Sequence, residues 1–178
     1  MVKLNAKQLR SYQSSAISRQ TIKKNDIYIV LDNVLDTYNI GSIFRLADAV
    51  VAKKIYLCGE TEIPPNHRIK KASINTTEIV DWGYSETALE AIKKLKEEVK
   101  NIQIISIEQS SKSTPYDEFE YKLPTCLVVG HESNGISKEV LEISDAIVEI
   151  PMFGVNISLN VVVSLGIVLY QVIEKTAR

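Results

Sequence analysis

Short apolar runs alternate with amphipathic stretches along most of the chain, and this alternation predicts the fold. Compact runs rich in Val and Ile predict strands at 27–31, 54–58, 102–107, 126–129 and 146–150. The less apolar stretch 77–82 is compatible with an edge strand. Because helical patterns separate these runs, the sequence predicts an α/β domain with a mainly parallel sheet flanked by helices.

Helix signals fall between the predicted strands. Asn39, Ser85 and Ser137 each stand where a side chain can cap a helix, which predicts helices to about residues 52, 100 and 143. A final helix is predicted at 159–172 and is apolar nearly all round. That pattern demands burial on several sides, either in the core of the domain or against a second subunit.

The composition is that of a globular domain with a core of its own. The chain has 178 residues, of which 45% are hydrophobic and 24% charged. Polar residues interrupt the longest apolar run, so no membrane span is expected, and no secretory signal is recognised at the N-terminus. Cys58 and Cys126 lack the spacing of metal ligands, so we expect no metal site and two reduced core thiols in a cytoplasmic protein.

Basic residues are concentrated in two places although the net charge is only −1. Residues 1–25 contain six bases and no acid, so the rest of the chain carries seven more acids than bases. We interpret 1–25 as a basic arm or helix and 67–71 as a basic cluster on a short helix or irregular segment. Local charge of this kind favours a polyanion, although a solvated, frayed terminus would have the same composition. The candidate phosphate contacts are Lys7, Arg10, Arg19, Lys23, Arg68, Lys70 and Lys71.

Three loops that follow predicted strands carry the candidate chemistry. Ligands of α/β proteins gather at the carboxyl ends of the strands, where such loops lie. The first loop opens the helix at 39–45, the second is 129–135, and the third is 150–160, where Pro, Gly, Asn and Ser connect a strand to the last helix. An acid at a buried strand end, such as Glu132, needs either a salt-bridge partner or a functional role.

Together these loops resemble the SpoU/TrmH-type family of RNA 2′-O-ribose methyltransferases in the SPOUT superfamily. The matching positions are Asn39, Gly41 and Arg45 in the first motif, Gly130, Glu132 and Gly135 in the second, and Ile150 to Met152, Gly154 and Ser158 to Val161 in the third. The order and separation of the motifs also agree. The chain departs from the pattern at Thr37-Tyr38, where relatives often have Pro, and at His131.

The resemblance implies a fold and a cofactor. It implies a methyltransferase domain at 26–178, with a C-terminal trefoil knot at about 125–175. It also implies that S-adenosylmethionine is bound there, largely through backbone groups. The positions that match cofactor contacts are Gly130, Ile150, Met152, Ser158 and Leu159.

The same resemblance implies a catalytic set: Asn39, Arg45, Glu132, Ser158 and Asn160. Guanidinium holds its proton to a pKa above about 12, so we expect Arg45 to bind a phosphate and stabilise the developing alkoxide. Asn39 would orient the ribose or Arg45, and Glu132 would hold Arg45 or another cation. Ser158 and Asn160 would line the pocket.

The family acts on RNA as a homodimer, and tRNA is favoured over rRNA as the substrate expected here. Two alternatives stay open at the level of sequence. One is a base-directed SPOUT RNA methyltransferase, and the other is a catalytically silent RNA-binding module.

Overall fold

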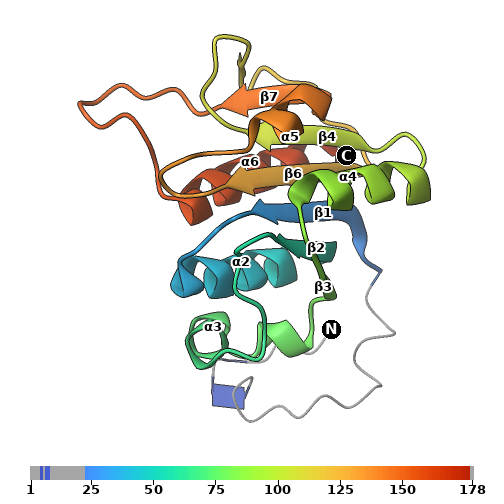
Figure 1. Cartoon of the computed structure of the whole chain (residues 1–178), viewed down its shortest axis with the longest axis vertical. Coiled ribbons are helices and arrows are strands. Elements are labelled where there is room, and N and C mark those ends of the chain that lie inside the picture. Colours follow the sequence, from blue (N-terminus) through green and yellow to red (C-terminus); the bar gives the residue numbers. More distant parts are fainter. Residues whose placement is uncertain (1–4, 6, 9–22, 177–178) are drawn as a thin grey trace.

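Seven strands form one parallel sheet in the part of the chain that the structure describes. The computed structural model describes residues 5, 7, 8 and 23–176. The strand order is β3-β2-β1-β6-β4-β7-β5, and every paired strand is parallel (Figure 1). The strands are β1 (Asn25–Asp32), β2 (Ala52–Cys58), β3 (Trp82–Ser85), β4 (Gln103–Ile107), β5 (Thr114–Pro115), β6 (Thr125–Gly130) and β7 (Ala146–Glu149). The predicted α/β fold class is confirmed.

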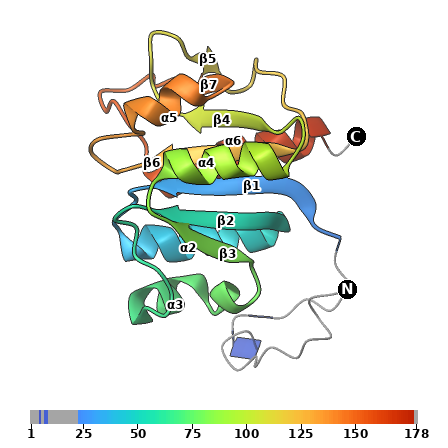
Figure 2. The ribbon, with the colours of Figure 1, turned by 45° about the vertical axis from the view of Figure 1, so that its right-hand side comes forward.

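Helices cover both faces of this sheet. They are α2 (Thr37–Ala49), α3 (His67–Ser73), α4 (Ala88–Glu98), α5 (Lys138–Ile143) and α6 (Val161–Thr176), with a 3₁₀ turn η1 at Thr76–Glu78. Figure 2 shows α4 and α5 on one face, and α2 and α6 on the other. Among the described residues, no helix is both long and apolar enough to cross a membrane.

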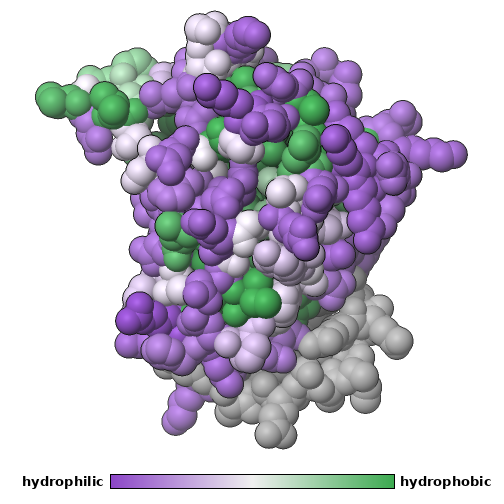
Figure 3. Space-filling model, viewed as in Figure 1, coloured by the Kyte–Doolittle hydropathy of each residue, from purple (hydrophilic) through white to green (hydrophobic). Residues whose placement is uncertain are grey.

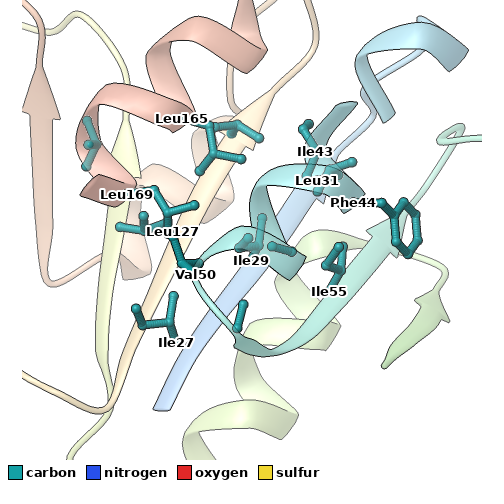
Figure 4. Close-up of a cluster of buried hydrophobic side chains, with 14 of the residues drawn as sticks. Ile27, Ile29, Leu31, Ile43, Phe44, Val50, Ile55, Leu127, Leu165 and Leu169 are labelled. Atoms are coloured by element: carbon teal, nitrogen blue, oxygen red, sulfur yellow. The ribbon is translucent and has the colours of Figure 1, made fainter. Parts of the chain in front are cut away.

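Strand β1 divides the apolar core into two clusters because its side chains alternate between the faces. Ile27, Ile29 and Leu31 pack with side chains of α2 and α6, as Figure 4 shows. Tyr28 and Val30 pack with α4 and α5 on the opposite face. Burial on both faces explains why this strand reads as a continuous apolar run.

The first helix begins earlier than its sequence indicates. Asp36, not Asn39, is the N-cap of α2, and its carboxylate accepts a hydrogen bond from the Tyr38 N–H over 2.7 Å. The prediction that Asn39 caps the helix is therefore wrong. Asn39 lies inside the first turn, is buried, and uses its side chain in contacts with other loops.

Two further local predictions are wrong around the edge strand. The stretch 77–82 forms η1 and a connection, and the edge strand itself begins at Trp82. Ser85 ends that strand, while Thr87 caps α4 by accepting from the Glu90 N–H over 3.1 Å. The amphipathic pattern located α4 correctly, but two neighbouring hydroxyl residues left the cap ambiguous.

Ser137 stands at the N-cap of α5 as predicted, but its side chain makes no capping hydrogen bond. Its N–H instead donates to the buried Asp32 carboxylate over 2.9 Å. This bond joins the end of β1 to the segment that follows β6.

The carboxyl ends of the central strands lie at one edge of the sheet. Asp32 pairs with Cys58 of β2 and with Gly130 of β6, so these three strands end in register. The loops that follow β1, β6 and β7, which carry the three motifs, therefore meet at this edge. The trefoil knot implied by the family resemblance stays a prediction.

Candidate active site

A pocket of about 670 Å³ lies at the carboxyl ends of β4, β6 and β7. Its apolar lining includes Ile107, Val129, Ile150, Leu159 and Val161. Its polar lining includes Glu108, Gln109, His131, Glu132, Glu149, Asn156, Ser158, Asn160 and Ser164. All five predicted cofactor residues line it, namely Gly130, Ile150, Met152, Ser158 and Leu159. The second and third motifs therefore form one concave site.

The loop after β6 folds back tightly on itself at the wall of the pocket. His131 and Gly135 exchange two backbone hydrogen bonds, of 3.1 and 2.9 Å. A Cβ on Gly130 would overlap the backbone of Gly135, and Gly135 itself has a φ of +68°. Both motif glycines are therefore required by the close approach of the chain to itself.

The His131 side chain closes the same loop. Its Nδ1 accepts hydrogen bonds from the backbone N–H groups of Ser133 and Asn134, over 2.9 and 3.2 Å. An imidazole nitrogen that accepts hydrogen bonds carries no proton, so in this arrangement Nδ1 is unprotonated. The residue that departs from the family pattern is thus a structural part of the loop.

Glu108 and Gln109 follow β4 and hold both cofactor loops. The Glu108 carboxylate accepts the N–H of Ile136 over 3.0 Å and that of Gln109 over 2.9 Å. The Gln109 side chain donates to the Ile157 carbonyl over 2.6 Å. Sequence reasoning missed both residues, although their position directly after a predicted strand would have placed them at the same edge of the sheet.

Two asparagines and a glutamate connect the three motifs. Glu132 Oε1 accepts from Asn39 Nδ2 over 3.0 Å and from the Asp36 N–H over 3.1 Å, and its Oε2 accepts from the Leu35 N–H over 3.2 Å. Asn39 Oδ1 in turn accepts from Asn160 Nδ2 over 3.1 Å. The side chains of Asn39, Glu132 and Asn160 therefore form one chain of hydrogen bonds, which we call the bridging triad.

Asn160 also begins the last helix. Its Oδ1 accepts the Val162 N–H over 2.9 Å, in the manner of an N-cap side chain. One side chain thus caps α6 with its oxygen and reaches α2 with its nitrogen. The start of α6 is fixed at Val161, two residues later than the apolar pattern predicted.

Comparison with known proteins assigns the family. Residues 26–170 match the model of the SpoU rRNA Methylase family. The chain belongs to this family.

The tRNA (guanosine(18)-2′-O)-methyltransferase of Aquifex aeolicus is 35% identical over 153 residues, which are 84% of this chain and 69% of that protein. The crystal structure of the Aquifex aeolicus TrmH/SpoU tRNA modifying enzyme is similar at a TM-score of 0.76 and 28% identity, over 96% of this chain and 81% of that one.

The AdoMet-bound rRNA methyltransferase of Sinorhizobium meliloti has a TM-score of 0.77 at 26% identity, over 93% of this chain and 59% of that one. This chain spans 61 to 69% of the lengths of three curated relatives.

Glu132, the acid of the second SpoU motif, has a different environment from the one expected. It is exposed rather than buried, and its partners are backbone N–H groups and Asn39 rather than Arg45. Desolvation raises its pKa, but the hydrogen bonds from Asn39, Leu35 and Asp36 outweigh this and lower the pKa below its ordinary value. Contrary to the prediction, Glu132 holds neither Arg45 nor another cation among the described residues.

Arg45, the arginine of the first SpoU motif, lies outside the pocket lining on the outer face of α2. It is exposed and forms no hydrogen bond or ion pair within the part of the chain that the structure describes. One turn earlier, Gly41 packs on α3, where an added Cβ would lie 2.6 Å from Ala72 Cβ. Residues four apart share a helix face, so Arg45 lies on the side of α2 that faces α3.

The basic cluster forms α3, and its cap is Asn66, which accepts from the Arg68 N–H over 2.9 Å. Arg68, Lys70 and Lys71 are all exposed on this helix. Lys7 and Lys23 are exposed as well, whereas Arg10 and Arg19 lie outside the described residues. Within the described ranges, no group of three or more His, Cys, Asp or Glu side chains could hold a metal ion.

Proposed function

We propose that this protein is an S-adenosylmethionine-dependent RNA methyltransferase that modifies a ribose 2′-hydroxyl in tRNA or rRNA. The bridging triad carries the proposal, because its side-chain contacts join the first SpoU motif to the second and third, which line one pocket. Sequence similarity to a tRNA 2′-O-methyltransferase over 84% of the chain supports the same reaction. A tRNA or rRNA substrate places the proposed activity in the cytoplasm.

The lining of the pocket suits S-adenosylmethionine. Aliphatic side chains such as Ile150 and Leu159 offer flat apolar contact for an adenine ring. The polar lining consists of carboxylates, amides, hydroxyls and one imidazole, and no Lys or Arg occurs among the described lining residues. That set favours a sulfonium cation and disfavours phosphate-bearing cofactors.

The bound cofactor supplies a methyl group that is already activated for displacement by its sulfonium. The protein must therefore hold the ribose hydroxyl in line with that methyl and help it lose a proton. The bridging triad fixes the loops that form the pocket, and Ser158 and Asn160 line it where they can orient the hydroxyl.

Arg45 binds the phosphate next to the target ribose in this proposal and stabilises the negative charge that develops on the oxygen. A guanidinium does so as a charged donor of two parallel hydrogen bonds, without losing its own proton. It is exposed and has no hydrogen-bond or ion-pair partner among the described residues, which leaves its donors available to RNA.

The RNA is gripped beyond the reactive nucleotide by α3, whose Arg68, Lys70 and Lys71 lie on the side of α2 where Arg45 emerges. Such side chains bind phosphates irrespective of sequence and provide affinity rather than selectivity. The basic arm at 1–25 extends the same role in this proposal. Compact tRNA is favoured, and rRNA is the alternative.

The active form is a homodimer in this proposal. The segment between β7 and α6 projects from the body in Figure 1, and Figure 3 shows hydrophobic side chains on the same projection. Phe153, Val155 and Ile157 are 96%, 101% and 78% exposed there, and Val163 and Tyr170 are 48% and 53% exposed on α6. Apolar surface this prominent favours coverage by a protein partner, and a second copy brings a second pocket close to the interface.

The decisive experiment measures transfer of labelled methyl from S-adenosylmethionine to total tRNA and, separately, to rRNA, followed by nucleoside analysis. A 2′-O-methylnucleoside in one pool is expected. Methylation of a base would assign the base-directed class instead. Failure to bind the cofactor would leave a silent RNA-binding module.

A further inference from the structure

Two glutamates, Glu108 and Glu149, occupy neighbouring positions at the ends of two paired strands. Strands β4 and β7 pair in parallel with Ile107 opposite Val148, and the next residues of each strand are Glu108 and Glu149. The Glu108 N–H donates to the Val148 carbonyl over 3.0 Å, which continues the ladder to this point. Both glutamates line the pocket.

No basic side chain neutralises this pair. None of the described lining residues is Lys or Arg, and neither glutamate takes part in an ion pair among the described residues. His131, the one imidazole on the lining, has Nδ1 occupied as an acceptor. Like charges on neighbouring strands repel each other and destabilise a sheet. A cation bound near Glu108 and Glu149 would therefore be stabilised by both charges.

The proposed reaction changes the charge of its cofactor. S-adenosylmethionine carries a sulfonium, an ammonium and a carboxylate, and so has a net charge of +1. On transfer, the carbon–sulfur bond breaks, sulfur keeps the electron pair, the methyl joins the ribose oxygen, and the hydroxyl proton leaves to solvent. The product, S-adenosylhomocysteine, is a thioether with no net charge.

We propose that Glu108 and Glu149 make the pocket select the cationic methyl donor over its neutral product, and so limit product inhibition. This inference rests on the proposed function, since it concerns how the same pocket treats its cofactor. The two residues act at a distance through charge and need not touch the sulfur. Glu108 is held in place by its bonds to the Ile136 and Gln109 N–H groups, whereas the Glu149 side chain makes no hydrogen bond among the described residues.

The test is calorimetric titration of the full chain with three ligands. These are S-adenosylmethionine, S-adenosylhomocysteine and sinefungin, a methyl-free analogue whose amine restores the positive charge. Glu149→Gln is the cleanest variant because it removes a charge and keeps the shape. We expect the Kd of the two cationic ligands to rise about tenfold, while the Kd of the neutral product changes by less than about twofold.

Glu108→Gln tests the second carboxylate. Glutamine retains only one of the two oxygen acceptors, so this variant is expected to weaken every ligand somewhat. The informative quantity is the Kd of the product divided by the Kd of the donor, which should again fall about tenfold. The same ratio in the wild-type protein should shrink as salt is raised, because salt screens charge.

Glu97→Gln is the matched control. Glu97 is exposed near the end of α4, next to the amino end of β4 and away from the pocket, so the ratio should not change. Equal weakening of donor and product by Glu149→Gln, or no weakening of either, would overturn the inference. If the wild-type protein binds none of the three ligands, the proposed function fails instead.

Discussion

The side-chain amide of Asn160 donates to Asn39 Oδ1 over 3.1 Å and so joins residues that are 121 positions apart. The Asn39 side-chain amide in turn donates a hydrogen bond to the Glu132 carboxylate over 3.0 Å. An asparagine amide can both donate and accept, and at Asn39 both capacities are used. The geometry of the site therefore depends on Asn39 being an amide rather than an acid of the same shape.

Replacing Asn39 by Asp tests that dependence. Asn39→Asp sets a carboxylate against Glu132 and removes the donor between them. We expect the free energy of unfolding at pH 7 to fall by about 1–3 kcal/mol, even though an acid in the first turn favours a helix by itself. Chemical denaturation measures it. The loss should be much smaller when Glu132→Gln is already present, and an equal loss in both backgrounds would contradict the bridge.

One glycine of the second motif and one of the third offer a matched pair of substitutions. Gly135 has a φ of +68°, and an added Cβ would overlap the Glu108 carboxylate, whereas Gly154 has no atom within 4 Å of its Cβ position. We expect Gly135→Ala to lower the free energy of unfolding by about 1–3 kcal/mol and to weaken cofactor binding. Gly154→Ala should leave stability unchanged. Thermal melts with and without S-adenosylmethionine report both effects.

Lowering the pH should weaken the hydrogen bonds that the Glu132 carboxylate accepts. Its pKa is lower in the folded protein than its ordinary value, because the hydrogen bonds that favour the carboxylate exceed the cost of desolvation. A depressed folded pKa contributes stability above the unfolded pKa, and this is lost as pH falls through the folded pKa.

The stability difference between wild type and Glu132→Gln should therefore be largest at neutral pH and shrink below about pH 4. Urea denaturation across that range measures it. The effect is expected to be modest because Glu132 is exposed. A difference that does not depend on pH would show that the carboxylate charge is irrelevant.

The sequence predicted the edge at which the site forms because parallel strands bring their carboxyl ends together. The resemblance to the SpoU/TrmH-type family assigned Gly130, Ile150 and Leu159 to a cofactor site, and all three line the pocket. The residue that caps α2 is harder to predict from the sequence. Asp36 and Asn39 are both good N-cap residues, but Asp36 caps the helix and Asn39 bonds instead to a glutamate 93 positions away.

Side-chain partners were the least predictable feature. Glu132 was expected to hold a cation, because a carboxylate at a strand end was assumed to be buried. The loop instead projects it to the surface, where backbone N–H groups of the loop after β1 satisfy it. The roles of Glu108 and Gln109 were not predicted, because no local sequence motif marks them. Their roles depend on the loops that converge on the end of β4.

A stripe on α6 tests the proposed homodimer. Val163 and Tyr170 are seven residues apart, lie on one helix face and are both about half exposed. Val163→Glu should give the mass of a single chain in light scattering at concentrations where the wild-type protein has twice that mass. Leu123→Glu, at an exposed leucine between β5 and β6, should leave the mass unchanged. A single-chain mass for the wild-type protein would refute the dimer.

Arg45 offers the sharpest separation of chemistry from binding. Because Arg45 does not line the pocket and forms no hydrogen bond or ion pair with a described residue, Arg45→Ala should leave the thermal midpoint unchanged and the Kd of S-adenosylmethionine within about twofold. Methyl transfer to RNA should nevertheless fall by at least about a hundredfold, since a donor to the developing charge is lost. Arg45→Lys should rescue little, because an ammonium cannot donate two parallel hydrogen bonds to a phosphate.

Arg68→Ala on α3 is the control. It should raise KM for RNA and reduce the salt dependence of binding by about one phosphate contact, with kcat retained. Rate measurements under single-turnover conditions, alongside calorimetry, distinguish the two. Parallel loss of cofactor binding and transfer in Arg45→Ala would show that Arg45 shapes the pocket and does not act on the RNA.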